Sequence, residues 1–504
     1  MFLRALGLIY FSAFYSLLFQ IKGLIGPAGI LPTERYLQAV GKSFGAAGYW
    51  YAPTLLWIGS SRHALDTLVC AGLIASALLT LNVWPRGMLV ACLLCFLSFI
   101  AAAQDFASYQ SDGMLLEAGF ICLFFSPPGL RPGLGRNQSP SRMSLFLLQW
   151  LWFRIYLESG LVKLASGEAQ WRNLTAMDEY YQNGPLPTWI GWYVQKLPHG
   201  FHATTALATL MMELALVWML FLPRRFRRIC FWIITPWEMG VILTANYAFL
   251  NYLVLSLGIL LLDDEYLAKL SPRRWREKLS PKEPAEEAQR GQPQSKAPSV
   301  ISHCVSAFFL GWIFYATTAW LVWIVLPGSS IPSKPVSVLA PFRIANRYGL
   351  FAIMTRGRYE IEFQGSRNGS TWQSYPFRYK PQDPRDRPRI YAPYQPRFEW
   401  NLWFASLGGW RENPFVVVTE VRLLENAADV LALFRSNPFS TDPPHQVRAV
   451  IWQYWFTNLE TNRSQGLWWR RELLGLYAPP LERRPDGTIA FVEKSDLAIA
   501  PPRE

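Results

Sequence analysis

The sequence predicts a polytopic α-helical membrane bundle of about nine spans, followed by a C-terminal β-rich (α+β) soluble domain. Hydrophobic residues make up 51% of the chain. Up to residue 326 they gather in runs close to the ~20 residues that cross a hydrocarbon core. After residue 336 apolar and polar residues alternate instead and are interrupted at Gly, Pro and Asn, which is typical of strands.

About nine segments have the length and composition of membrane-crossing helices. The segment at 114–125 is the shortest, and a re-entrant or buried segment is the alternative there. The segments are 3–19, 64–83, 87–104, 114–125, 145–163, 204–222, 229–243, 249–262 and 302–325. We therefore expect a membrane domain at 1–262, a charged cytoplasmic linker at 263–300, a last span at 301–326 and an external domain at 327–504.

Two arginine-rich loops predict the orientation. The loop at 131–142 holds three arginines and no acid, and 223–228 holds four arginines. Such loops stay on the cytoplasmic side of a membrane. Alternating spans then place the N-terminus inside, and they place 21–62, 168–201 and everything after residue 327 outside. The net charge of +13 belongs to this signal, because no zinc-finger spacing or basic helix with heptads indicates a nucleic-acid partner.

The span at 145–163 carries Arg154, Glu158 and Lys163, although charges inside a bilayer are costly and mark functional or paired positions. Arg154 and Glu158 stand four residues apart on one helical face and can neutralise each other. Their further candidate partners are carboxylates of neighbouring spans, namely Glu117, Glu213 and Glu238. A structural ion-pair cluster is the simplest interpretation. Lys163 lies on the opposite face, where it either snorkels to the interface or serves as a buried base.

The chain shows no established catalytic or metal motif. His199 and His202 could share a helical face, but no third ligand is spaced nearby. No HExxH, GxSxG, P-loop or dinucleotide fingerprint is present. We therefore expect no metal, no cofactor and no catalytic residue, with Lys163 as the exception only if the membrane half is an enzyme.

Several strings in one order resemble the lipase maturation factors. The C-terminal part contains NRYGLF at 346–351, EFQGSRNGSTW at 362–372, YPFRYKP at 375–381, QPRFEW at 395–400 and WFASL at 403–407; the membrane half contains SDGMLLEAGF at 111–120, SGLVKL at 159–164 and NYAFLNYLVLSLGILLLDD at 246–264. One segment departs from the family pattern. The family carries a Tyr-His-Phe-Glu-Thr-Gln run before Pro-Leu-Pro, whereas this chain has EYYQNG at 179–184.

The resemblance implies a membrane protein that assists the folding, assembly and export of secreted clients such as lipases, and that performs no catalytic step. Its partners would be a lipase-like client and membrane lipids, with the oligomeric state left open. No cysteine follows Cys304, so the external domain holds no disulfide, and we expect a bacterial inner membrane with a periplasmic C-terminal domain. In a eukaryote the compartment would be the endoplasmic reticulum.

Aromatic and arginine residues of the external domain are the expected client contacts, because apolar surface patches mark interaction sites. Packing in the domain core is the alternative for each tryptophan. The candidates are Trp372, Arg397, Trp400, Trp403, Arg448, Trp468 and Trp469.

A second resemblance concerns one helix of the membrane half. GLVKL at 160–164 followed by Trp171 is similar to the Gly-x-x-Lys-Leu…Trp segment of the vitamin K-dependent gamma-carboxylases. This implies the alternative function, an integral-membrane enzyme that uses Lys163 as a base beside a lipid-like substrate.

Overall fold

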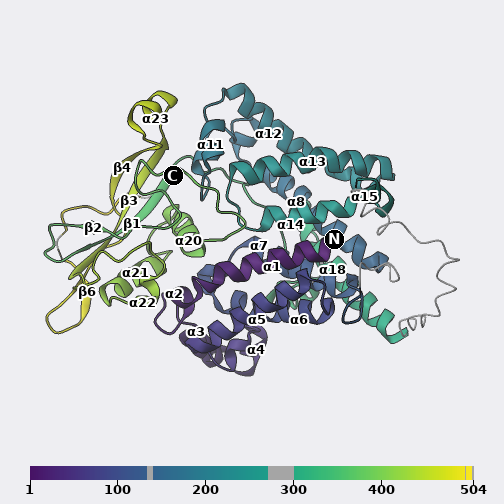
Figure 1. Ribbon diagram of the computed structural model, residues 1–504, viewed down its shortest axis with the longest axis horizontal. Coiled ribbons are helices and arrows are strands. Elements are labelled where there is room, and N and C mark those ends of the chain that lie inside the picture. Colours follow the sequence, from purple (N-terminus) through teal and green to yellow (C-terminus); the bar gives the residue numbers. More distant parts are fainter. Residues whose placement is uncertain (133–139, 271–299, 494, 502–504) are drawn as a thin grey trace.

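The computed structural model describes residues 1–132, 140–270, 300–493 and 495–501. Helices of the membrane half run together on one side of the molecule, and the C-terminal sheet packs against one end of them (Figure 1). Every segment predicted to span the membrane contains a helix. Four of these helices are long and apolar enough to cross a membrane: α5 (Arg62–Thr80), α6 (Pro85–Ala102), α12 with its 3-10 extension (His199–Phe221) and α18 (Val300–Val325).

The other five are shorter or carry more charge, so their crossing stays a prediction. They are α1 (Phe2–Leu18), α7 (Gln110–Phe125), α8 (Arg142–Ala165), α13 (Arg224–Thr244) and α14 (Leu250–Gly258). Helix α7 shows why hydropathy underestimates the length of such helices. All of its residues from Ser111 to Gly119 are buried, and a helix surrounded by protein can carry polar groups as long as they have partners. The helix therefore begins four residues before the predicted start at residue 114.

The connections between these helices gather at two ends of the bundle. At one end they contact the C-terminal domain: Tyr109 donates to Asn401 Oδ1 at 2.6 Å, and Asn246 Nδ2 donates to the carbonyl of Arg389 at 2.8 Å. At the other end, Arg228 in the first turns of α13 pairs with Asp263 of the connection after α14 at 2.6 Å. The N-terminus and α15 (Asp264–Leu270) lie at this second end (Figure 1). Residues 271–299 of the predicted linker at 263–300 lie outside the described residues.

Short helices occupy the longer connections. They are α2 (Ile21–Ile25), α3 (Thr33–Phe44) and α4 (Gly48–Tyr51) before α5, and α9 (Ala169–Arg172), α10 (Tyr180–Asn183) and α11 (Trp189–Val194) before α12; α19 (Lys334–Ser337) and α23 (Leu459–Gln465) lie in the C-terminal part.

The C-terminal domain is built on two long antiparallel strands, β1 (Arg358–Ser366) and β3 (Gln446–Phe456), paired along the whole of β1. The short strands β2 (Gln373–Ser374), β5 (Leu481–Arg483) and β6 (Ile489–Phe491) give the order β2-β1-β3-β5-β6, and β4 (Trp469–Leu476) also pairs with β3. Strands β1 and β2 form a hairpin around the Asn-Gly pair at 368–369, although β2 has only two residues.

Helices cover this sheet, and their bounds differ from the sequence pattern. Apolar residues recur at helical spacing over 421–434 and predict one helix there, but the structure has α21 (Phe415–Leu424) and α22 (Ala428–Leu431). Between them Asn426 takes a left-handed φ of 53°, which ends a helix. Helix α20 (Arg397–Ser406) is buried at nine of its ten positions, so no polar stripe marks it as a helix in the sequence.

Candidate functional site

The charges of α8 form two separate clusters inside the bundle. In the first, the fully buried Arg154 pairs with Glu158 on its own helix, Nη1 to Oε1 at 3.2 Å, and with Glu117 of α7. Arg154 Nη1 also donates to the carbonyl of Asn346 at 2.9 Å. The predicted i, i+4 pair is therefore present, with a second carboxylate and a segment from beyond the last membrane helix added to it.

That segment completes the hydrogen bonding of both carboxylates. The backbone N–H of Asn346 donates to Glu117 Oε2 at 2.9 Å, and the N–H of Tyr348 donates to Glu158 Oε2 at 2.6 Å. Asn346 Nδ2 donates to the carbonyl of Gly113 at 2.9 Å. This close approach needs a glycine, because a Cβ on Gly113 would lie 2.7 Å from Asn346 Oδ1. The SDG and NRYG strings thus meet in one structure.

The second cluster is centred on Lys163, which is 3% exposed. Its Nζ donates to Glu213 Oε1 and Oε2 at 2.6 and 2.8 Å and to Ser159 Oγ at 2.8 Å, and it lies 5.0 Å from the centre of the Trp171 ring. The snorkelling interpretation of Lys163 is therefore wrong. The side chain points into the bundle because a carboxylate of α12 is within reach there.

Glu238 of α13, the last predicted member of the charge set, has neutral partners. It accepts a hydrogen bond from Tyr156 Oη at 2.7 Å, and Asn251 also bonds to its carboxyl group. It forms no ion pair among the described residues.

The second cluster and Glu238 line one cavity of about 310 Å³. Its walls come from α8, α12, α13 and α14, from the connection before α12 and from the segment after α18; helices α12 and α13 lie together in the upper part of Figure 1. Most of the lining is apolar or aromatic. Its charged residues are Lys163, Glu213 and Glu238, and its hydroxyl groups belong to Tyr156, Tyr180, Tyr181, Tyr247, Tyr348, Ser159, Thr205, Thr209 and Thr244.

Buried polar contacts fasten the C-terminal domain to the bundle. Arg397 is 1% exposed and forms a bidentate pair with Asp112, with both N···O distances at 2.7 Å. Arg358 is fully buried and donates to the carbonyls of Gln182, Gly184 and Pro185. The segment that departs from the family pattern therefore supplies carbonyl groups and the Gln182 side chain, which accepts from Phe456 N at 2.7 Å.

Most of the predicted client contacts are inside the protein. Arg397, Trp400, Trp403, Arg448 and Trp469 are buried, with exposed fractions from 1 to 7%. Arg448 pairs with Asp496 and lies over the Trp372 ring at 4.0 Å. Trp372 and Trp468 are partly exposed. Client binding by these residues stays a prediction, and only the last two present surface to a partner.

Sequence patterns missed two buried acids, one that fastens the C-terminal domain to the bundle and one that joins two segments within the C-terminal domain. Asp112, the partner of Arg397, stands at the start of an apolar run, and this isolated acid was the available signal. Glu399 of α20 accepts hydrogen bonds from the backbone N–H groups of Arg378, Tyr379 and Lys380 at 2.5 to 2.8 Å. Burial raises the pKa of Glu399 to about 7. No local sequence pattern predicts such contacts, because the donors lie some twenty residues away.

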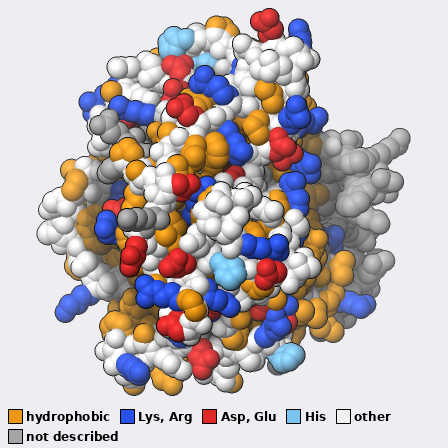
Figure 2. Space-filling model, turned by 90° about the vertical axis from the view of Figure 1, so that its left-hand side faces the viewer, with side chains coloured by type: hydrophobic (Ala, Val, Ile, Leu, Met, Phe, Trp, Pro, Cys, Tyr) orange, Lys and Arg blue, Asp and Glu red, His pale blue; other side chains and the backbone are white. Residues whose placement is uncertain are grey.

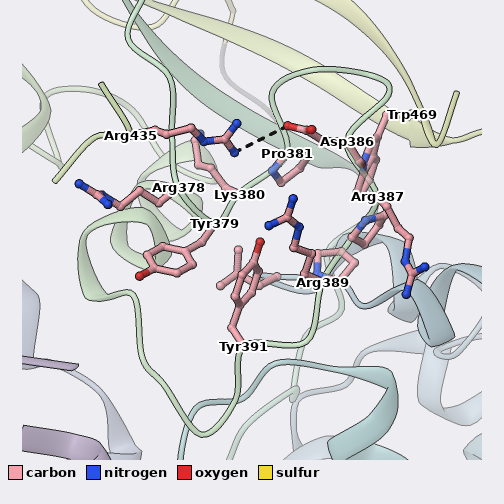
Figure 3. A pocket seen from close by; sticks show the side chains of 13 residues that line it. Arg378, Tyr379, Lys380, Pro381, Asp386, Arg387, Arg389, Tyr391, Arg435 and Trp469 are labelled. Atoms are coloured by element: carbon pink, nitrogen blue, oxygen red, sulfur yellow. Dashed lines mark hydrogen bonds and ion pairs between the residues drawn. The ribbon is translucent and has the colours of Figure 1, made fainter. Parts of the chain in front are cut away.

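A smaller hollow in the C-terminal domain is strongly basic. Figure 3 shows Arg378, Lys380, Arg387, Arg389 and Arg435 around it, with Asp386 paired to Arg435 at 3.9 Å. Its volume of about 20 Å³ accommodates little more than one water molecule. We therefore assign no ligand to it.

The two histidines considered as metal ligands do not share a site. His199 Nδ1 lies 2.9 Å from Asp178 Oδ1, while His202 is buried beside the Tyr181 ring. Within the described ranges, no group of three or more His, Cys, Asp or Glu residues could hold a metal ion.

Two family models match the membrane half and the C-terminal part of the chain. Residues 1–269 match the family model of the lipase maturation factor transmembrane domain, and 344–479 match that of the lipase maturation factor C-terminal domain. The chain is 33% identical to lipase maturation factor 1 of Bos taurus over 96% of this chain and 88% of that protein. It is 30% identical to lipase maturation factor 2 of Gallus gallus over 95% of this chain and 80% of that protein. No solved structure matches it.

Proposed function

Since the chain belongs to the lipase maturation factor family, we propose that it assists the folding, assembly and export of secreted client proteins such as lipases. The family resemblance drawn from the sequence strings is confirmed. One observation supports the client role most directly: the C-terminal domain is fastened to one end of a membrane bundle by the buried Arg397–Asp112 ion pair and by the buried hydrogen bonds of Arg358. A surface on this domain is therefore held beside the membrane, where exported chains emerge.

The orientation is part of the proposal. We place the C-terminal domain on the non-cytoplasmic side, which is the periplasm in a bacterium and the lumen of the endoplasmic reticulum in a eukaryote. The arginine-rich loops support this placement. The segregation of the connections supports nine crossings, since the loops expected outside are those that contact the C-terminal domain.

The outer edge of β4 is the client surface we propose. The edge of β1 that faces away from β3 is not available for pairing. Tyr375 N donates to the carbonyl of Phe363 there, and Ser406 Oγ donates to the carbonyl of Tyr359. In contrast, β4 pairs only with β3 within the part of the chain that the structure describes, apart from its two ends, where Trp469 N donates to the carbonyl of Pro384 and Leu476 forms a bridge with Ile499. An exposed strand edge can pair with an extended segment of another chain.

The character of the surrounding surface favours recognition by a strand edge. Figure 2 shows the face of the C-terminal domain that points away from the bundle, where charged side chains of both signs separate small groups of hydrophobic ones. A client lacking its final fold exposes backbone groups as well as apolar side chains. Pairing along β4 would protect such a strand independently of its sequence.

The experiment compares two leucines of similar exposure in the same domain. Leu473 on β4 is 36% exposed and Leu459 on α23 is 40% exposed. We expect Leu473→Lys to lower secreted lipase activity severalfold at matched protein level, because lysine on a strand edge discourages pairing. Leu459→Lys should leave secretion unchanged. Equal secretion with both variants would remove β4 as the client surface, and normal secretion without any copy of the protein would remove the client role.

The enzyme alternative is less well supported. A general base needs a free lone pair, whereas the three donor positions of the Lys163 ammonium are engaged by Glu213 and Ser159. Retained client secretion in Lys163→Arg agrees with a structural ion pair. Lost secretion in this variant, with normal protein level, would favour the enzyme.

A further inference from the structure

The 310 Å³ cavity of the membrane half has one polar wall. Lys163 and Glu213 stand beside Ser159 there, and Glu238 stands beside Tyr156. The remaining lining is mainly aliphatic and aromatic, with Ile155, Leu250, Val254, Leu350 and Phe351 among its members. A space polar at one wall and apolar elsewhere matches an amphiphilic molecule.

The cavity reaches the surface between α12 and α13. Phe201 of α12 is 43% exposed, and Pro236 and Gly240 of α13 are exposed while also lining the cavity. Pro236 lies inside α13, where it removes a backbone hydrogen bond and bends a helix. Gly240 presents no side chain to close the gap. If both helices cross the membrane as predicted, the opening faces the lipid rather than the aqueous phase.

The charges of the polar wall select the head group. One ammonium, that of Lys163, faces the two carboxyl groups of Glu213 and Glu238, and no other Lys or Arg lines this described cavity. Glu213 engages Lys163, which leaves Glu238 without a cation. A buried carboxylate favours a positive or hydrogen-bond-donating partner, and a third carboxylate would be repelled.

We propose that this cavity binds a single-chain amphiphile whose head group donates hydrogen bonds, a hydroxyl or an ammonium, to Glu238 and the neighbouring tyrosines. Its alkyl chain would leave between α12 and α13. The volume supports one chain, since it corresponds to roughly ten groups of the size of water and lies near the lower limit of ligand pockets. This site is independent of the client surface, because β4 contributes nothing to its lining.

The test measures binding to the full-length protein in nanodiscs of two-chain phospholipid, with three probes of equal chain length: a monoacylglycerol, an alkylamine and a fatty acid. We expect saturable binding of the monoacylglycerol, the alkylamine or both, and at least about tenfold weaker binding of the fatty acid, which is ~1.4 kcal/mol. The first two probes tell a hydroxyl head from an ammonium head. Equal binding of the fatty acid, or no saturable binding of either other probe, would overturn the proposal.

A matched pair of tryptophan variants and one variant of Glu238 test whether the probes bind in this cavity. Thr209→Trp should fill the cavity and abolish binding, whereas Thr204→Trp on the exposed side of α12 should not. Glu238→Gln should weaken alkylamine binding and strengthen fatty-acid binding, a reversal that a misfolded protein would not show. If Thr209→Trp stays folded by size exclusion and still binds the probes, the ligand lies elsewhere and the proposal fails.

Discussion

Arg154 illustrates how far a residue's role can be predicted from its spacing. Its pairing with Glu158 follows from the i, i+4 rule. The contact with Glu117 and the N–H groups of residues 346 and 348 could not be predicted, because they depend on how α7 and a distant segment pack. Likewise, the sequence offered two interpretations of Lys163, and only the position of Glu213 decides between them.

Because Arg154 pairs with two carboxylates, those of Glu117 and Glu158, removing only one of them should not fully rescue a variant that lacks the arginine. Arg154→Leu leaves two buried carboxylates without their cation, which costs about 3–5 kcal/mol, so little folded protein should be recovered. Adding Glu158→Leu should restore only part of it, because Glu117 remains unmatched. Adding Glu117→Gln as well should restore more. Size-exclusion yield of the three variants measures this, and full rescue by the double variant would show that Glu117 is not part of the cluster.

Glu420 predicts a pH dependence of stability. It is fully buried in α21, and burial raises its pKa well above the usual 4.5. In the folded state the carboxyl group keeps its proton at pH values where the unfolded chain has lost it. The folded state then binds more protons, so this residue's contribution to stability is complete below pH 4.5 and falls as pH rises above it, by up to ~1.4 kcal/mol per pH unit.

Glu420→Gln removes this titration. Thermal unfolding should show equal stability of the variant and the parent near pH 4.5, with the variant increasingly more stable toward pH 8. Glu472→Gln on the exposed side of β4 serves as the control and should follow the parent. A constant difference between Glu420→Gln and the parent across this range would contradict the assignment.

At the scale of elements, hydropathy located the membrane helices well and the C-terminal helices poorly. Apolar runs give α5, α6 and α18 within a few residues, because their outer faces meet no protein. Helix α20 is covered on all sides, and the break between α21 and α22 depends on one backbone angle at Asn426. Periodicity records which face of an element is exposed, so it fails where none is.

Gly113 tests the contact between α7 and the segment after α18. A Cβ at this position would lie 2.7 Å from Asn346 Oδ1, and Asn346 cannot move cheaply because its Nδ2 donates to Gly113, Glu117 and Arg343. Gly113→Ala should therefore lower the melting temperature, although alanine favours a helix. The matched change Gly240→Ala meets no atom within 4 Å and should be neutral or stabilising by up to ~1 kcal/mol. Equal effects of both would contradict the close packing.

At the scale of the whole molecule, the two halves form one structure. Arg358 of β1 bonds to the carbonyls of residues 182, 184 and 185, and Arg397 of α20 pairs with Asp112 of α7. The division into a membrane part and a β-rich part was visible in the sequence. Their interface was not, because these buried contacts of Arg358 and Arg397 join residues between 173 and 285 positions apart.

This interface makes the orientation testable with intact chains. If all nine helices cross and the arginine-rich loops are cytoplasmic, the loops that contact the C-terminal domain lie on the opposite side together with it. A periplasm-only enzymatic reporter fused after residue 504 should then be active, and the same reporter inserted within 271–299 should be silent. A cytoplasm-only reporter at the same two sites should give the reverse. Activity of one reporter at both sites would mean an even number of crossings between them, contrary to α18 as a span, and exchange of the two patterns would place the C-terminal domain inside, where it could not meet an exported client.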